Sequence, residues 1–238
     1  MKSLILVTVL ILSISSFAED FPKHNIKNFN EAKKILKEIY PEYKTFYCGC
    51  DYSYKTKKVD TSKCGYVPLG NYKGFIDFEH IPAAQSWGQS FKEWRDGDPK
   101  CVTKKGKKYK GRRCANKNPK YKAMEADLHN LVPALPELNR RRKNYTLTEI
   151  AGEERKYGKC DFEISNKKAE PRDEVKGDVA RALFYMQDRY GIKVISNKQK
   201  KLYEAWNKLD PVDDEERRIN CLKAKYQGNV NKFIGECK

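Results

Sequence analysis

The chain has 238 residues, and its 49 lysines and arginines outnumber 32 acidic residues to give a net charge of +17. This length suits one domain with a sizeable core, or at most two, and excludes a larger assembly of domains. The charge excludes little about the fold, but it indicates partners that carry negative charge: nucleic acid, an anionic membrane or an acidic polysaccharide.

Residues 1–18, MKSLILVTVLILSISSFA, have the pattern of a secretory signal peptide. Lys2 supplies the positive start, an apolar run follows, and small residues precede a cleavage position after Ala18. The alternative, a membrane anchor, is disfavoured because the run is shorter than the ~20 residues that a span needs. No later segment is apolar enough to span. We therefore expect an exported protein, periplasmic or extracellular, with one domain over residues 19–238.

Eight cysteines follow the expected cleavage position. An even number in an exported chain predicts disulfides. A zinc site is disfavoured, because no CxxC pair occurs and no histidine lies at finger spacing. Every pairing remains open at this level. The cysteines are Cys48, Cys50, Cys64, Cys101, Cys114, Cys160, Cys221 and Cys237.

Apolar spacing predicts a helix over residues 28–40, ended by Pro41. An irregular segment rich in Tyr, Gly, Lys and Cys follows over 46–73, and a short strand is expected over 75–81. Residues 96–120 form a long basic loop, which a disulfide between its two cysteines would make a β-ribbon or a closed loop.

Helical spacing returns over residues 120–131, which Pro133 is expected to end, and three further helices are expected nearer the C-terminus. Their ranges are 173–190, 197–209 and 213–227. The expected fold class is α+β: a mostly helical, disulfide-bonded single domain with a small antiparallel sheet.

The strand in GFIDFEHIPA ends with Glu79 and His80. Neighbouring side chains of a straight strand point to opposite faces, so both reach one substrate only where the strand ends, which Ile81-Pro82 provides. The carboxylate suits a hard divalent cation, and the imidazole suits proton transfer from water. The alternative is a structural histidine beside a surface glutamate, and the pair alone does not exclude it.

A second candidate lies in MEADLHNLVPALPELNRRRKN, residues 124–144. On a helix, Asn130 could present its oxygen to a metal, with Asp127 three residues earlier in support. The alternative is a solvated face at a helix end, which the spacing alone favours.

Positive charge is concentrated in residues 104–113 and again in 140–143. Such runs are often only solvated, but phosphates neutralised by them would give sequence-independent, salt-sensitive binding. The residues expected to bind nucleic acid are Lys104, Lys105, Lys107, Lys108, Lys110, Arg140, Arg141 and Arg142.

Four segments together resemble the endonuclease I family of exported, disulfide-containing bacterial nucleases: FEHIPA, GRRCANKNPKYKAMEADLHNLVPALPELN, AEPRDEVKGDVARALFYMQDRYGI and LYEAWNKLDPVDDEERRIN. The resemblance runs from about Ile26 to Cys237. It implies a ββα-metal (His-Me finger) site, in which a strand bears the base and a helix bears a metal ligand. It also implies cleavage of DNA and RNA, single- or double-stranded, without sequence preference. Nothing indicates a large apolar interface, so a monomer is expected.

By matching position, the resemblance implies that Glu79 and Asn130 bind Mg²⁺, with Mn²⁺ or Ca²⁺ as substitutes, and that His80 is the general base. The phosphate-stabilising arginine lies just before a cysteine, so Arg112 or Arg113 is implied. Products would carry 5′-phosphate ends, and activity should fall below the reference histidine pKa near 6.5.

The chain departs from the family pattern in two places. LNGDR or VNGDR is usual where it has Leu138-Asn139-Arg140-Arg141-Arg142, so a role for Asn139 stays open. The 101–114 loop is longer and richer in lysine than usual. The alternative function is a secreted basic protein that coats DNA or other polyanions without cutting, which explains the charge and cysteines but not the family contexts of Glu79, His80 and Asn130.

Overall fold

The computed structural model describes residues 21–71, 74–152 and 154–237, so the expected signal peptide lies outside the described residues. The helices are α1 (Phe29–Ile39), α2 (Ala84–Gly88), α3 (Lys92–Arg95), α4 (Arg112–Ala115), α5 (Pro119–Ala126), η1 (Leu128–Asn130), α6 (Pro136–Arg142), η2 (Asp173–Val175), α7 (Lys176–Tyr190), α8 (Asn197–Leu209) and α9 (Asp214–Gln227). The strands are β1 (Glu42–Lys44), β2 (Asp51–Ser53), β3 (Lys58–Asp60), β4 (Asp77–His80), β5 (Leu131–Ala134), β6 (Thr146–Leu147), β7 (Phe162–Ser165) and β8 (Lys168–Pro171).

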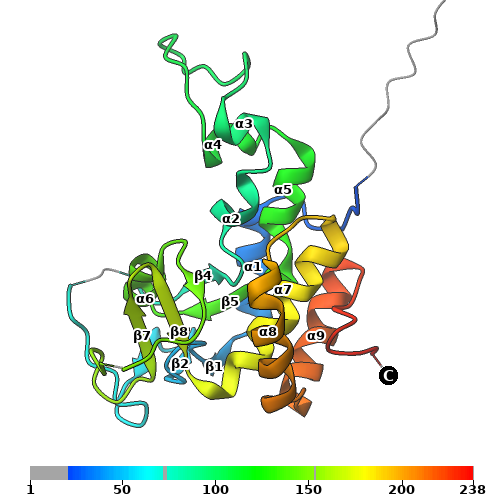
Figure 1. Cartoon of the computed structure of the whole chain (residues 1–238). Helices are drawn as coiled ribbons and strands as arrows, with labels where there is room; N and C mark the ends of the chain where they lie inside the picture. The colour runs from blue at the N-terminus through cyan, green and yellow to red at the C-terminus, as the bar shows by residue number, and fades with distance from the viewer. Residues whose placement is uncertain (1–20, 72–73, 153, 238) are drawn as a thin grey trace, which may run out of the picture.

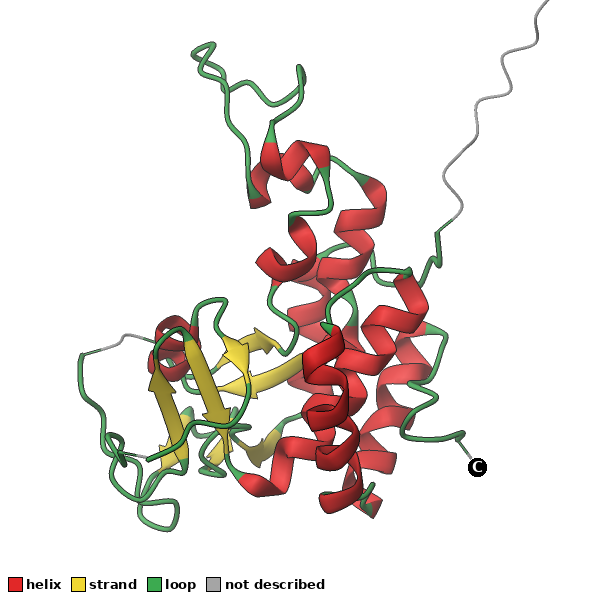
Figure 2. Cartoon of the chain, in the orientation of Figure 1, coloured by secondary structure: helices red, strands yellow, loops and turns green. Residues whose placement is uncertain are grey.

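The long helices gather on one side of the molecule and the short strands on the other (Figures 1 and 2). The four helices predicted over 28–40, 173–190, 197–209 and 213–227 are confirmed as α1, η2 with α7, α8 and α9. Gly191 ends α7 and Gly228 ends α9, both in the left-handed conformation that glycine adopts without strain. These four predicted ranges therefore agree with the structure to within one residue at each end.

The strands form three small sheets instead of the single sheet that was expected. The strand orders are β1-β2-β3, β4-β5 and β6-β8-β7, and each pair is antiparallel except β6–β8, which is parallel. In the second sheet Glu79 lies opposite Val132, and His80 lies opposite Leu131. Helix α6 follows β5 after one residue, so β4, β5 and α6 have the ββα order that the resemblance implies.

The helix predicted over 120–131 is wrong beyond Ala126. Asp127 leaves the helix because its buried carboxylate accepts hydrogen bonds from the hydroxyls of Tyr185 and Tyr190, at 2.8 and 2.7 Å. A single 3₁₀ turn and strand β5 follow. Pro133, expected to stop a helix, lies inside β5, where its carbonyl accepts a bond from the backbone of Phe46. A proline is tolerated there because the sheet has only two strands.

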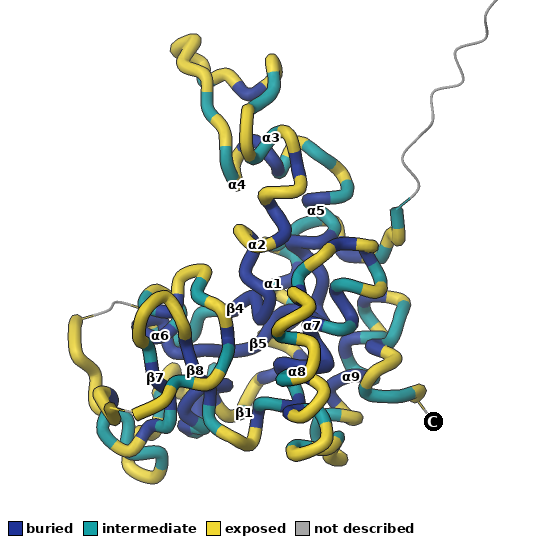
Figure 3. The backbone as a smooth tube through the Cα atoms, viewed as in Figure 1, coloured by how far each residue is buried: buried dark blue, intermediate teal, exposed yellow. Residues whose placement is uncertain are grey.

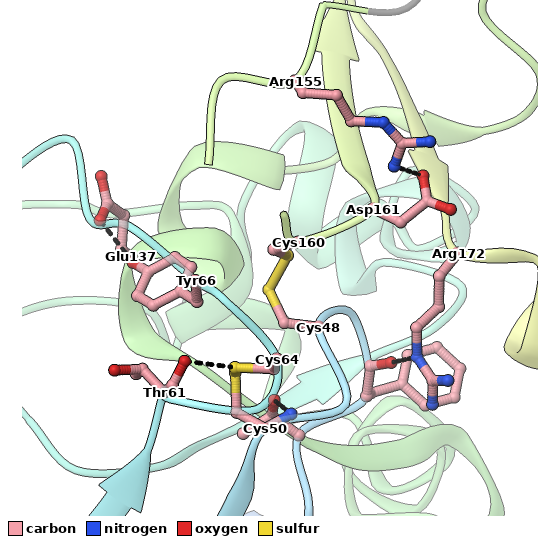
Figure 4. The surroundings of a disulfide bond; sticks show 12 residues. Cys48, Cys50, Thr61, Cys64, Tyr66, Glu137, Arg155, Cys160, Asp161 and Arg172 are labelled. Carbon is pink, nitrogen blue, oxygen red and sulfur yellow. Dashed lines mark hydrogen bonds and ion pairs between the residues drawn. A yellow bond between two sulfur atoms is a disulfide. The ribbon is translucent and has the colours of Figure 1, made fainter. Parts of the chain in front are cut away.

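All eight cysteines are paired, which confirms the disulfide prediction. The pairs are Cys48–Cys160, Cys50–Cys64, Cys101–Cys114 and Cys221–Cys237. The first two lie side by side where the segment before β2 meets the segment before β7 (Figure 4). No helix within the described ranges is both long and apolar enough to cross a membrane.

Candidate active site

One pocket of about 300 Å³ gathers residues from segments that are far apart in the chain. Strand β4 contributes Glu79 and His80 at its end, α4 contributes Arg112, and α6 contributes Asn139. Phe29 of α1 forms part of the wall. A larger cavity, of about 1120 Å³, contains none of these side chains. The chemistry predicted from the sequence therefore belongs to the smaller pocket.

Glu79 is held by two partners that both contact Oε1. The hydroxyl of Tyr47 donates to it at 3.2 Å, and Nη1 of Arg142 donates to it at 2.6 Å. No hydrogen bond within the described part of the chain uses Oε2, so this oxygen can serve another ligand. Burial raises the pKa of Glu79, and the guanidinium of Arg142 opposes that rise.

The ring of His80 is oriented by a backbone carbonyl. Its Nε2 lies 2.9 Å from the carbonyl oxygen of Glu125, which can only accept, so we assign the proton to Nε2. Nδ1 then carries a lone pair, and no described group bonds to it. Burial, reinforced by Arg112, lowers the pKa of His80 to about 3. The imidazole is therefore expected to be neutral in mild acid, so we now expect the loss of activity, predicted from the sequence below pH 6.5, to occur at lower pH.

Of the two candidate arginines, Arg112 lines the pocket and Arg113 does not. Nε of Arg112 donates to Oε1 of Glu125 at 2.5 Å, and its guanidinium lies 5.3 Å from the centre of the Phe29 ring. Its side chain is 48% exposed, so it is fixed in direction yet accessible to a ligand. Arg113 instead lies over Tyr109, 4.3 Å from the ring centre.

The structure does not bring Asn130 into the pocket with Glu79 and His80. Asn130 lies fully buried in η1, and its amide nitrogen donates to the carbonyl of Pro82 at 3.3 Å. Asn139, on the helix after the second strand, is partly exposed and lines the pocket. A signal for Asn139 was present in the sequence. Asn139 matches the asparagine of the LNGDR or VNGDR motif, from which this chain departs in the residues that follow.

The pocket offers oxygen donors of the kind that suit a hard divalent cation. The carboxylates of Glu79 and Asp77 and the amide of Asn139 all line it, and Asp77 and Glu79 share one face of β4. Mg²⁺ keeps several waters and needs only one or two protein ligands. The residues present therefore fit such an ion.

The second basic cluster differs from its prediction at Arg142, which is only 3% exposed. Its guanidinium pairs with Glu79 and donates to the carbonyls of His80 and Ile81 at 2.7 and 2.6 Å. The prediction that Arg142 binds nucleic acid is therefore wrong, because the side chain is committed to the interior. Arg141 is partly exposed and pairs with Glu137 at 2.8 Å, and Arg140 is exposed.

The five lysines predicted to bind nucleic acid between α3 and α4 are all exposed. They are Lys104, Lys105, Lys107, Lys108 and Lys110. Lys33 and Lys143 add positive charge to the pocket itself, which the sequence reasoning missed. The basic surface therefore extends from the pocket onto the neighbouring loop.

Comparison with known proteins gives the chain its family. The family model described as Endonuclease I matches residues 20–238. An extracellular deoxyribonuclease of Aeromonas hydrophila is 35% identical over 90% of this chain and 91% of the relative. A periplasmic deoxyribonuclease of the same species is 34% identical over 87% and 85%. An extracellular ribonuclease of Bacillus subtilis is 40% identical over 45% of this chain and 43% of its own length. The resemblance read from the sequence is thus confirmed: the chain belongs to the endonuclease I family, and with it to the enzymes that hydrolyse phosphodiester bonds in nucleic acids.

Proposed function

We propose that this protein is a metal-dependent endonuclease that cuts DNA and RNA without sequence preference, after export to the periplasm or the medium. The observation that carries the proposal is the convergence of Glu79, His80, Arg112 and Asn139, from the three separate elements β4, α4 and α6, on one pocket. The names of its relatives support both nucleic acids as substrates and an extracytoplasmic location.

Glu79 and Asn139 would hold Mg²⁺, with Mn²⁺ or Ca²⁺ as substitutes. Asn139 replaces Asn130 in this role because a hydrated ion needs a ligand that reaches the pocket, and Asn130 is fully buried. When bound, the ion supplies positive charge that stabilises the negative charge developing on the phosphate and the leaving oxygen.

The side chains of the protein would do the remaining work. Nδ1 of His80 accepts a proton from the attacking water, and Arg112 donates to a nonbridging phosphate oxygen as charge develops there. Glu125 positions both groups, since its carbonyl fixes the tautomer of His80 and its carboxylate holds Arg112. Attack by water breaks the bond between phosphorus and the 3′ oxygen, which takes up a proton from solvent water, so the products carry 5′-phosphate and 3′-hydroxyl ends.

A plasmid assay tests the proposal. The protein should nick supercoiled DNA with Mg²⁺ and not with EDTA. His80→Ala should lower the rate by about 10²- to 10⁴-fold, the usual contribution of a general base. It should leave DNA binding unchanged in a gel shift. His24→Ala, at a partly exposed histidine outside the pocket, is the matched control and should keep its rate.

Two results would contradict the proposal. A gel shift without Mg²⁺-dependent nicking would make the protein the non-cutting polyanion binder. Full activity of His80→Ala would remove the proposed base. Metal binding is measured separately by titrating Mn²⁺ into the protein in a calorimeter, where Asn139→Ala should weaken binding and Asn130→Ala should not, provided that both variants melt as the wild type does.

A further inference from the structure

The segment between α3 and α4 stands away from the rest of the molecule. Residues 97–111, called the arm below, extend beyond the helices in Figures 1 and 2. Apart from the buried Cys101, its residues are exposed or partly exposed, as the tube in Figure 3 shows. Such a segment buries too little apolar surface to contribute much to the core. Any role that it has must therefore depend on its exposed side chains.

The arm is a short two-stranded ribbon with a defined shape. The backbone of Tyr109 donates to Cys101 and that of Thr103 donates to Lys107, both at 2.9 Å, and Val102 pairs with Lys108 in an antiparallel bridge. The disulfide Cys101–Cys114 closes its base. These cross-links hold the two strands together, so the arm can act as one rigid projection.

Positive charge dominates the arm, which carries six lysines and a single acidic residue, Asp98. All six lysines are exposed, and none forms an ion pair with another described residue. Lysines elsewhere do form such pairs: Lys232 lies 2.7 Å from Asp188, and Lys176 lies 2.8 Å from Glu170. The arm therefore keeps its positive charge available for an external anion.

The arm is anchored directly beside the pocket. Its last residue, Gly111, donates its backbone N–H to Trp94 at 3.0 Å, which ties the end of the arm to α3. The next residue is Arg112, which lines the pocket. A nucleic acid bound by the arm therefore continues toward the proposed site of cleavage.

We propose that the arm docks in the major groove of double-stranded DNA and that its lysines contact the phosphates on either side. This rests on the proposed function, because it assigns the duplex as the substrate presented to that pocket. The major groove of B-form DNA is about 12 Å wide and admits a two-stranded ribbon, whereas the minor groove is about 6 Å wide and must be widened by deforming the duplex before a ribbon can enter. The four residues from Cys101, at the base, to Lys104 reach at most ~14 Å when extended, which still exceeds the groove depth of about 8.5 Å. The major groove of an RNA duplex is narrow and deep, so the arm should discriminate against it.

The test removes the charge at the end of the arm. In the arm variant, four lysines become alanine: Lys104→Ala, Lys105→Ala, Lys107→Ala and Lys108→Ala. A matched control removes four exposed lysines from α8, which contributes nothing to the pocket: Lys198→Ala, Lys200→Ala, Lys201→Ala and Lys208→Ala. Both lose the same charge, so a general effect of net charge appears equally in both. Melting temperatures establish that both fold.

Binding is measured by fluorescence anisotropy in EDTA, with a 20-base-pair DNA duplex and an RNA duplex of the same sequence, over a series of salt concentrations. For DNA, four lost phosphate contacts should lower the slope of log K against log salt by about 3 to 4 in the arm variant. For RNA the slope should change by less than about 1. The control should match the wild type on both.

Each other outcome overturns the inference. An unchanged slope for DNA means that the arm makes no phosphate contacts. Equal changes for DNA and RNA mean that it binds polyanions without entering the groove, and equal changes in arm variant and control mean that only net charge matters. Because binding is measured without metal, it is independent of cleavage: failure of wild-type protein to nick plasmid would refute the proposed function and leave the result on the arm standing.

Discussion

The arm and the arginine run at the end of α6, Arg140 to Arg142, are both clusters of positive charge, yet their side chains have different environments. In the arm, every lysine is exposed and without an ion-pair partner among the described residues. In the run, Arg142 is buried and bonded to Glu79 and to two backbone carbonyls. A run of charged residues in the sequence therefore predicts the sign of the surface charge, but it does not predict which of the side chains is buried. A buried carboxylate 63 residues away decides that.

The largest effect should come from breaking the buried pair. Methionine is similar in size to arginine but carries no charge, so Arg142→Met leaves Glu79 buried without its cation. The free energy of unfolding should therefore fall by about 3–5 kcal/mol. Urea denaturation measures this. The arm variant should lose at most about 0.5 kcal/mol per substitution, since exposed lysines stabilise little. A loss below about 1 kcal/mol for Arg142→Met would mean that Arg142 is not structural and that the two regions do not differ.

The root of the arm offers a second contrast, between neighbouring arginines. Arg112→Ala should lower kcat by about 10²- to 10³-fold, as removal of a single donor to developing negative charge does. Arg113→Ala, whose guanidinium lies over Tyr109 outside the pocket, should change kcat by no more than a few-fold. Single-turnover cleavage of a labelled duplex measures both. Equal losses would place both arginines at the phosphate.

The smallest effect concerns Lys143, which follows Arg142 and lines the pocket. Its backbone has φ +54° and ψ −122°, a conformation that favours glycine. Lys143→Gly should therefore be more stable than Lys143→Ala by about 0.5–1 kcal/mol, although glycine normally destabilises. Both variants lose the ammonium, so the comparison isolates the backbone, and thermal melts measure it. If the alanine variant is the more stable, the backbone at this position is not strained.

Much of the fold could be predicted where local signals agree with the tertiary structure. Gly191 and Asp210-Pro211 are stop signals in the sequence, and α7 and α8 end there in the structure. The helix predicted over 120–131 was too long. The apolar spacing correctly predicted which residues are buried, but it did not predict that the helix ends at Ala126. Leu128 and Leu131 are fully buried, but a 3₁₀ turn and a strand carry them there. The helix ends because Asp127 bonds to the hydroxyls of Tyr185 and Tyr190. These partners lie about sixty residues further along the chain, so the local sequence does not indicate them.

The candidate site was predictable in its strand and not in its helix. Glu79 and His80 are adjacent, so one strand end places both in the pocket. The second proposed metal ligand required a choice between two asparagines nine residues apart, Asn130 and Asn139. That choice depends on where α5 ends and where α6 begins. The amide of Asn130 lies in the 3₁₀ turn and is buried, whereas the amide of Asn139 lies on α6 and lines the pocket. Residue spacing does not supply this information, and the only sequence signal for Asn139 was its place in a motif that this chain matches in part.

The disulfide between Cys48 and Cys160 has a consequence for how the protein is made. In the proposed export the N-terminus crosses the membrane first, so Cys50 and Cys64 both appear long before Cys160, which follows Cys48 by 112 residues. Oxidation in order of emergence would join Cys48 to its neighbour Cys50, which is not the native partner of either. Cys48 must therefore stay reduced until most of the polypeptide has crossed, or exchange partners through a mixed disulfide. The yield of active nuclease should accordingly depend on a disulfide isomerase in the compartment where the protein matures.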